Sequence, residues 1–306
     1  MCCLFGMVDY KHSLTPIQKS RMMSILAREC EARGTDATGI AYNSSHRLKI
    51  FKRPLPARYM HFMLPKDTHA VMGHTRMTTQ GSEKKNRNNH PFPGHAGNTA
   101  FALAHNGVLY NDVALRKNKK LPPTSIQTDS YIAVQLIEKS GFIDMESLRD
   151  MAEQVRGSYA FSVLDDQDNL YLVKGDNPIC LYHYPILGLY LHASTEDILN
   201  KALSKMPVQL EKPVKIDLIC GDILKISPNG VLTRGYFNCD HLLPKMVWSP
   251  YASFFDYGVA ESSVSYIDDL KAVAGSFGLT DEDVDILLKE GFTPEEVEEY
   301  LYSAWV

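Results

Sequence analysis

The second half of the chain contains short β-type segments separated by turn-forming residues, and this pattern restricts the fold more than any other feature. Six such segments lie between residues 158 and 236, and Asp-Asn, Asn-Pro, Gly and Pro-Asn-Gly sequences separate them. A single predicted helix, at 195–203, interrupts the series. Short strands joined by turns of this kind form hairpins, so we expect antiparallel sheets and not a parallel, doubly wound one.

The first half of the chain adds more strands and clearly delimited helices. The apolar run at 2–8 predicts a strand that is buried on both faces. Thr15, Pro16 and Gln18 form a capping-box pattern, which predicts a helix from Pro16 to about residue 33. Further strands are predicted at 38–42, 48–51, 70–74 and 99–105, with a turn at 43–45, and further helices at 129–140 and 144–155.

Two basic stretches lie between these elements. They are Lys84–Arg87, in a long Asn-rich loop, and Arg116–Lys120. A nucleic-acid site and solvated loops both explain such stretches, and the absence of interleaved aromatic residues favours loops. The length of the Asn-rich loop makes it a candidate for a functional role.

The N-terminal dipeptide Met1-Cys2 is a candidate nucleophile. If Met1 is removed, Cys2 carries a thiol and a free α-amine, and the pKa values of both groups lie near neutrality. The amine can then act as the base for its own side chain, so no distant His is required. Two alternatives remain for Cys2-Cys3: an acylation site, or the start of a buried strand. We expect Cys3 to be a buried strand residue, because it has no free amine.

Several polar motifs follow Cys2 in a fixed order. They are Arg33–Ile40, Gly73–Gly81, Asn89–Phe92, His105–Gly107 and Thr128–Ser130, and then Arg156–Ala160, Gly175–Pro178 and His192–Glu196. In this order the chain resembles the glutaminase domain of class II glutamine amidotransferases, which are N-terminal-nucleophile hydrolases. The similarity is greatest to the domain of glucosamine-6-phosphate synthase and covers roughly residues 2–235. The resemblance implies an α+β fold, a four-layer αββα sandwich of two stacked antiparallel sheets between helical layers.

The resemblance also implies catalytic roles. Cys2 would attack the glutamine amide, and the resulting oxyanion needs preorganised hydrogen-bond donors. The side-chain amide of Asn106 and the backbone N–H of Gly107 match the oxyanion hole of the family. Considered without the resemblance, Asn106-Gly107 is typical of a hairpin turn.

Three further residues match positions that bind substrate in the family. Arg76 matches the arginine that binds the α-carboxylate, Asp129 the acid that binds the α-ammonium, and Thr79 a threonine that contacts the substrate. The alternatives are a surface ion pair for either charged residue, or a helix N-cap for Asp129.

Two departures from the family pattern affect these expectations. Cys3 stands where the family usually has Gly, and the sequence from Met77 to Gln80 replaces Trp-Ala-Thr-His. The loss of the aromatic at Met77 puts closure of the glutamine pocket in question. The histidines show no metal-ligand spacing, so neither a metal nor a cofactor is expected.

The C-terminal segment differs in composition from the rest of the chain. Residues 261–306 contain twelve Asp or Glu and two Lys, a net charge of −10, which leaves +6 for residues 1–260. We therefore expect an amidotransferase-like domain at 2–237, a linker at 238–260 and an acidic helical segment at 261–306. Its helices are predicted at about 265–277, 281–290 and 294–302, and the segment faintly resembles a ubiquitin-associated protein-binding module.

The sequence shows neither of the two signals that would direct a chain to a membrane or to secretion. No stretch approaches about 20 apolar residues, and the N-terminus lacks the pattern of a signal peptide. The six cysteines have no C-x-x-C spacing and are expected to be reduced. A cytoplasmic protein that binds neither nucleic acid nor membrane fits these features best.

The leading hypothesis is a glutaminase-type amidohydrolase that yields glutamate and ammonia. Only about 70 residues follow the matched region, so no synthase domain fits and a separate ammonia acceptor or partner synthase is expected. The alternatives are a stand-alone amidohydrolase of a non-glutamine amide, and a non-catalytic regulatory or adaptor protein. The C-terminal segment is a candidate site for a protein partner.

Overall fold

The chain forms two compact units, Met1–Leu243 and Pro244–Val306. The computed structural model describes residues 2–242 and 280–290, together with Ile267, Lys271, Ala274, Phe292 and Val297. The other residues of the second unit include most of the predicted linker and the predicted helices at 265–277 and 294–302, so those predictions lie outside the described residues. The two units are considered separately below.

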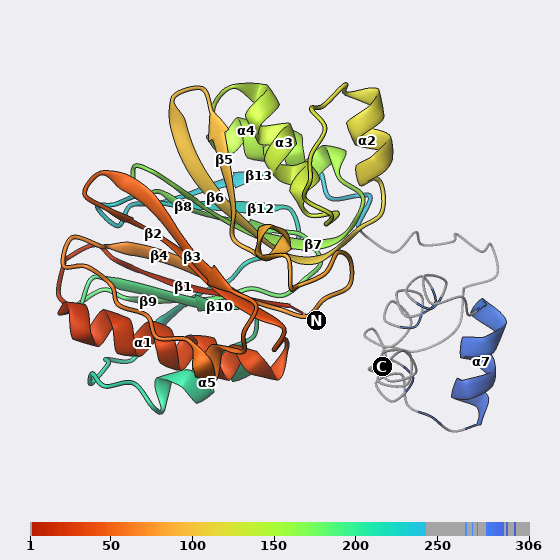
Figure 1. Ribbon diagram of the computed structural model, residues 1–306. Helices are drawn as coiled ribbons and strands as arrows, with labels where there is room; N and C mark the ends of the chain where they lie inside the picture. The colour runs from red at the N-terminus through yellow and green to blue at the C-terminus, as the bar shows by residue number, and fades with distance from the viewer. Residues whose placement is uncertain are drawn as a thin grey trace, which may run out of the picture. The chain divides into compact units, whose positions relative to one another are not determined.

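Two antiparallel sheets form the centre of the first unit (Figure 1). All the strand pairs within them are antiparallel, as the hairpin pattern predicts. The seven-stranded sheet has the order β11 (Val214–Ile216), β9 (Cys180–Tyr184), β10 (Leu189–Ala193), β1 (Cys3–Asp9), β4 (Ala70–Arg76), β2 (Ala37–Ser44), β3 (Arg47–Arg53). The six-stranded sheet has the order β13 (Leu232–Tyr236), β12 (Asp222–Ile226), β8 (Leu170–Lys174), β7 (Gly157–Asp165), β6 (Thr99–Leu109), β5 (Phe92–Ala96).

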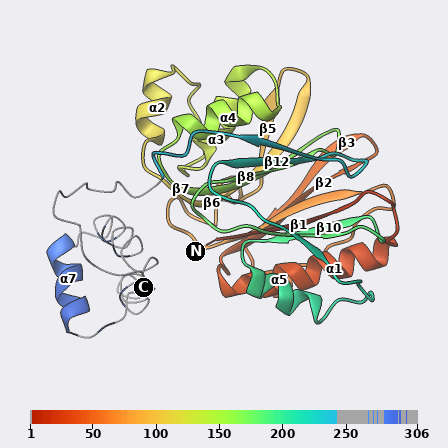
Figure 2. The ribbon, with the colours of Figure 1, turned by 180° about the vertical axis from the view of Figure 1, so that it is seen from behind.

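Helices cover the outer face of each sheet, which gives four layers (Figures 1 and 2). The helices α1 (Pro16–Glu29) and α5 (Glu196–Leu203) lie on the seven-stranded sheet, and α2 (Asp112–Asn118), α3 (Tyr131–Ser140) and α4 (Met145–Gln154) lie on the other sheet. Separate clusters of buried apolar side chains fill the space between the sheets and beneath each helical layer. The predicted α+β, αββα sandwich is therefore confirmed.

Local sequence signals account for the ends of several helices. The Thr15 hydroxyl accepts a hydrogen bond from the Gln18 N–H, and the Gln18 side chain accepts one from the Thr15 N–H, so the predicted capping box at α1 is confirmed. Asp144 caps α4 in a similar way. Gly141 ends α3 in the left-handed conformation, with φ of 80°, which glycine adopts without a steric penalty.

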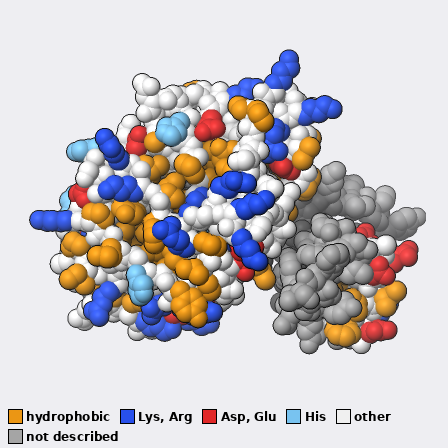
Figure 3. Space-filling view, in the orientation of Figure 1, with side chains coloured by type: hydrophobic (Ala, Val, Ile, Leu, Met, Phe, Trp, Pro, Cys, Tyr) orange, Lys and Arg blue, Asp and Glu red, His pale blue; other side chains and the backbone are white. Residues whose placement is uncertain are grey.

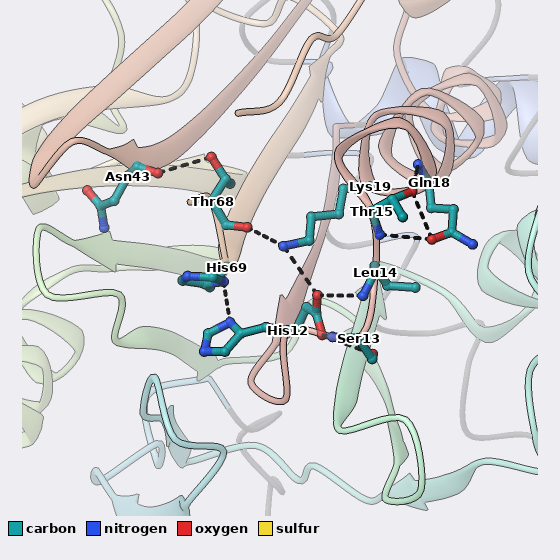
Figure 4. Close-up of polar contacts among 10 residues, drawn as sticks. His12, Ser13, Leu14, Thr15, Gln18, Lys19, Asn43, Thr68 and His69 are labelled. Carbon is teal, nitrogen blue, oxygen red and sulfur yellow. Dashed lines mark hydrogen bonds and ion pairs between the residues drawn. The ribbon is translucent and has the colours of Figure 1, made fainter. Parts of the chain in front are cut away.

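A buried ion pair fastens α1 to the C-terminal end of β1. Lys19 Nζ lies 3.2 Å from the carboxylate of Asp9, and the two side chains are 1% and 0% exposed. Lys19 also donates to the Thr68 carbonyl oxygen at 2.6 Å (Figure 4). The Asp9 carboxylate accepts further hydrogen bonds from the N–H groups of Ser13 and Leu14. This network lies about 20 Å from Cys2, since β1 separates the two.

Some elements differ from the predictions. The turn between β2 and β3 is formed by Ser45 and His46, both with positive φ, and not by residues 43–45. Residues 116–118 were predicted as loop but belong to α2. Lys84 and Lys85 are exposed loop residues, as predicted, whereas 86–88 form a short 3-10 helix. The strands β5 and β11 were not predicted.

The described part of the second unit includes the helix α7 (Asp281–Lys289). Thr280 caps it with a capping box, and its first turn is acidic, as predicted. Ala274, Val284 and Val297 form a small buried apolar cluster there. Figure 3 shows Lys and Arg side chains spread over the visible face of the first unit, and acidic and apolar side chains on the described part of the second. None of the described helices is long and apolar enough to cross a membrane.

Candidate functional site

A pocket at the N-terminal end of β1 brings together most of the predicted site residues. Cys2, Arg76, Thr79, Gly107 and Asp129 all line it. The start of β1 pairs with the end of β4, which places Cys2 beside Arg76, and β6 of the other sheet supplies Gly107. Asp129 comes from the segment that leads into α3. The pocket is narrow, and its free space of about 10 Å³ corresponds to about one water molecule.

The Cys2 thiol is held by the backbone of Met77. The sulfur donates to the Met77 carbonyl oxygen and accepts from the Met77 N–H, both at 3.4 Å. The Cys2 carbonyl oxygen accepts a hydrogen bond from Arg33 Nε at 3.0 Å. Burial raises the pKa of the Cys2 thiol, and the Met77 N–H and the charge of Arg76 offset this only in part. The thiol is therefore protonated at neutral pH and needs a base before it can attack.

Arg76 is buried and bonded to neutral oxygens. The guanidinium is 3% exposed and donates to Asn89 Oδ1 at 2.7 Å and to the carbonyl oxygens of Gln80 and Gly81 at 2.6 and 2.8 Å. The alternative of a surface ion pair is wrong, because the side chain is buried and none of the ion pairs among the described residues includes it. A guanidinium with neutral partners keeps its full charge for a bound carboxylate.

Asp129 is anchored to the strand that carries Gly107. Its carboxylate accepts a hydrogen bond from the Leu109 N–H at 2.5 Å and one from the Ser130 hydroxyl at 3.3 Å. Asp129 is 5% exposed, so it is not a surface ion pair, and it is not the N-cap of α3, because Ser130 occupies that position. The Asp129 N–H donates to the side-chain oxygen of Gln80 at 2.7 Å, which ties the 77–81 segment across the pocket.

Asn106 and Gly107 lie within β6 and pair with Ala160 and Tyr159 of β7, so the hairpin-turn alternative is wrong. Gly107 has a φ of 138°, and a Cβ there would lie 1.9 Å from the Ser158 carbonyl oxygen, so only glycine fits. Asn106 does not line the pocket itself. Its side-chain nitrogen lies 3.5 Å from the Ser194 hydroxyl, a long contact that leaves the amide weakly held.

Comparison with known proteins identifies the family. Residues 74–200 match the model of the glutamine amidotransferase domain. Glutamine–fructose-6-phosphate aminotransferase (isomerizing) of Staphylococcus aureus is 30% identical over 191 residues, which are 59% of this chain and 30% of that protein. The protein of the same name from Staphylococcus epidermidis is 29% identical over 188 residues, 58% of this chain and 30% of that protein.

Residues 74–200 belong to a class II glutamine amidotransferase domain. Its fold is shared with glutamine phosphoribosylpyrophosphate amidotransferase from B. subtilis, with a TM-score of 0.59 and 19% identity, over 78% of this chain and 50% of that one. The chain spans about 30% of the length of the curated relatives named above.

The amidotransferase pocket also contains residues to which the sequence assigned no role. Gln80 was noted only as a departure from the family pattern, yet its amide bonds to the backbone of Asp129. The side-chain oxygen of Asn89 accepts a hydrogen bond from Arg76 and so helps to hold the guanidinium in place. His90, His105 and Thr128 line the pocket as well. All three lie within the motifs on which the resemblance depends, so the sequence indicated that they belong near the site. A motif does not indicate which atoms each of its residues contacts.

Four histidines near the pocket or within the sheets, His74, His90, His105 and His192, are buried. Burial lowers the pKa of His74 and of His192 to about 3, and it also lowers the pKa values of His90 and His105. The described residues include no group of three or more His, Cys, Asp or Glu arranged to hold a metal ion.

Proposed function

We propose that this domain hydrolyses the side-chain amide of glutamine, with Cys2 as an N-terminal nucleophile, to give glutamate and ammonia. The observation that carries the proposal is the convergence of Cys2, Arg76, Thr79, Gly107 and Asp129 on one pocket from separate elements of the fold. A nucleophile, a buried cation and a buried carboxylate in one pocket are what a zwitterionic amide substrate requires. The proposal places this unit at residues 2–237, followed by a linker at 238–260.

The two charged residues would hold the two ends of free glutamine. The guanidinium of Arg76 is fixed by Asn89 and can take the α-carboxylate in a bidentate contact. The carboxylate of Asp129 can take the α-ammonium. Glutamine is larger than one water molecule, so the 77–81 segment has to move for the substrate to enter. Thr79 and Gln80 of this segment are exposed. Movement of the segment would break the hydrogen bond from the Asp129 N–H to the Gln80 side chain.

Acylation would begin once Met1 has been removed. The free α-amine of Cys2 takes the proton of the thiol, and Sγ attacks the amide carbon. The side chain of Asn106 and the N–H of Gly107 would stabilise the oxyanion, and the loose contact from Asn106 to Ser194 lets the amide turn toward it. The amine then gives its proton to the leaving group, ammonia departs, and a γ-glutamyl thioester remains until water releases glutamate.

We propose that a separate synthase or another partner protein accepts the ammonia. The acidic segment at 261–306 is our candidate for a partner-binding region. Two of its apolar side chains, Ile286 and Phe292, are 53% and 44% exposed and could contact a partner. We expect the protein to act in the cytoplasm, where its six free cysteines stay reduced.

Two alternatives follow from particular observations. The Gln80 side chain lies where the family has His and narrows the pocket, which favours an amide other than glutamine. The exposed apolar side chains of Ile286 on α7 and of Phe292 beyond it favour a non-catalytic adaptor. Glutamate release from glutamine by the purified chain separates these from the proposal. Cys2→Ala should abolish release, and Cys3→Ala, the matched control in the buried start of β1, should retain it. Equal release by Cys2→Ala and the wild type would rule out Cys2 as the nucleophile.

A further inference from the structure

Unpartnered polar atoms gather at the pocket that contains Cys2. Both ring nitrogens of His90 and the hydroxyl of Thr128 are buried and have no hydrogen-bond partner among the described residues. Both side chains are 4% exposed, and both line the pocket. A buried polar atom without a partner destabilises the folded chain, because it has lost its hydrogen bonds to water. Two such side chains at one pocket therefore indicate a bound polar ligand.

The surroundings of His90 define the chemistry of that ligand. The imidazole packs between the rings of His74 and Phe92, with centroids 4.2 and 4.3 Å away. Burial lowers the pKa of His90 well below its usual value, and the charges of Arg76 and Lys52 act in the same direction. A neutral imidazole offers one donor and one acceptor, and a threonine hydroxyl offers both. The site therefore fits a small neutral molecule that can donate and accept, while the charge of Arg76 disfavours a cation.

The pocket places this ligand beside the nucleophile. Before substrate enters, the free space in the pocket is close to that of about one water molecule. Because Cys2 lines the same pocket, a water bound there lies beside the position of the thioester. None of the contacts to Arg76 or Asp129 described above involves His90 or Thr128, so substrate binding leaves this pair available.

We propose that His90 and Thr128 bind and position the water that hydrolyses the γ-glutamyl thioester on Cys2. The inference rests on the proposed function. The oxygen of the water forms a bond to the thioester carbon, and the C–S bond breaks with its electron pair going to Sγ. One proton of the water passes through the α-amine of Cys2 to the thiolate, so the products are glutamate and the free thiol. His90 and Thr128 are positioning residues that hold the water with the hydrogen bonds they otherwise lack.

The test separates deacylation from acylation. Wild type, His90→Phe and Thr128→Val are mixed with glutamine and quenched, and the intact protein mass reports the thioester while ammonia and glutamate are followed separately. We expect the first turnover of ammonia to stay within about threefold of wild type. Deacylation should slow by about 100-fold, the effect of misplacing a reacting group, so the thioester should accumulate. His90→Gln, which keeps a donor and an acceptor, should recover part of the rate.

Two buried residues provide matched controls. His192 has an unpartnered ring nitrogen and Ser162 an unpartnered hydroxyl, and neither lines the pocket. His192→Phe and Ser162→Ala should therefore leave deacylation unchanged. Added hydroxylamine competes with water for the thioester, so the ratio of γ-glutamyl hydroxamate to glutamate should rise in His90→Phe and not in His192→Phe.

The outcomes distinguish this inference from the proposed function. A thioester that forms and decays at the same rate in the wild type, His90→Phe and Thr128→Val overturns the inference and leaves the glutaminase mechanism standing. Equal slowing in His90→Phe and His192→Phe also overturns it. If the wild type forms no thioester with glutamine, both the function and the inference fail. A crystal structure with no ordered water bonded to His90 or Thr128 overturns the inference alone.

Discussion

Replacement of Gly107 by alanine tests whether the strand geometry of β6 sets the oxyanion donors. The added Cβ would lie 1.9 Å from the Ser158 carbonyl oxygen and 2.7 Å from Asn177 Nδ2, far inside contact distance. The strands β6 and β7 would have to separate by more than about 1 Å. Backbone strain at a φ of 138° costs about 1–3 kcal/mol and overpacking about 1–3 kcal/mol more, so we expect a loss of about 2–6 kcal/mol.

The same displacement moves the Gly107 N–H away from the oxyanion. Loss of one such donor costs about 100- to 1,000-fold in kcat, so Gly107→Ala should lower glutamate release by at least that factor. A unit of this size loses about 2–4 °C in Tm per kcal/mol, so a loss of about 2–6 kcal/mol predicts a fall of about 4–24 °C. Circular dichroism and steady-state kinetics below the new Tm measure both quantities.

Gly141→Ala is the matched control. Gly141 also has a positive φ, 80°, but a Cβ there would meet nothing within 4 Å, and it ends α3. We expect a cost of about 1 kcal/mol from backbone strain alone and an unchanged kcat. If Gly107→Ala keeps kcat within about fivefold of wild type and loses no more stability than Gly141→Ala, the account of this strand is wrong.

Three further predictions concern charged side chains. Lys19→Met leaves the Asp9 carboxylate buried and unpaired, which should cost about 3–5 kcal/mol in urea unfolding with kcat unchanged at 20 °C; a cost below about 1 kcal/mol would contradict the buried ion pair. Arg76→Lys keeps the charge but loses the planar fork, so KM for glutamine should rise about 10- to 150-fold, and an unchanged KM would exclude Arg76 as the carboxylate site. Burial lowers the pKa of Lys52 to about 8, so between pH 8 and 10.5 the unfolded chain binds more protons than the folded one. The stability of the wild type relative to Lys52→Met should therefore rise with pH across this window in unfolding titrations, and a flat difference would refute the assignment.

The elements that were predictable from sequence are those fixed by local signals. The capping box at Thr15 and the glycine stop at Gly141 each depend on a few neighbouring residues, so α1 and α3 were predicted closely. The strand β11 (Val214–Ile216) has only three residues and lies at a sheet edge, so its sequence is too short to predict a strand that depends on pairing with β9. The sequence predicts a loop at 116–120, where the structure has the end of α2. This short polar helix is stabilised by packing against α3, which the local sequence does not indicate.

The site was predictable in composition and less so in contacts. The resemblance assigned roles to Arg76 and Asp129, and the structure places both at the pocket with Cys2. It could not indicate that Gln80 bonds to the Asp129 N–H, because that contact joins residues 49 positions apart. The unpartnered nitrogens of His90 were equally invisible, since satisfaction of a buried polar atom is a property of the packed structure.

The N-terminal nucleophile can be tested by intact-mass analysis of the purified chain with and without glutamine. We expect a chain that lacks Met1 and gains a γ-glutamyl adduct on Cys2 during turnover, with no adduct in Cys2→Ala and an adduct retained in Cys3→Ala. A chain that retains Met1 yet releases glutamate at the same rate would contradict the proposed mechanism, because Cys2 would then have no free α-amine to act as its base.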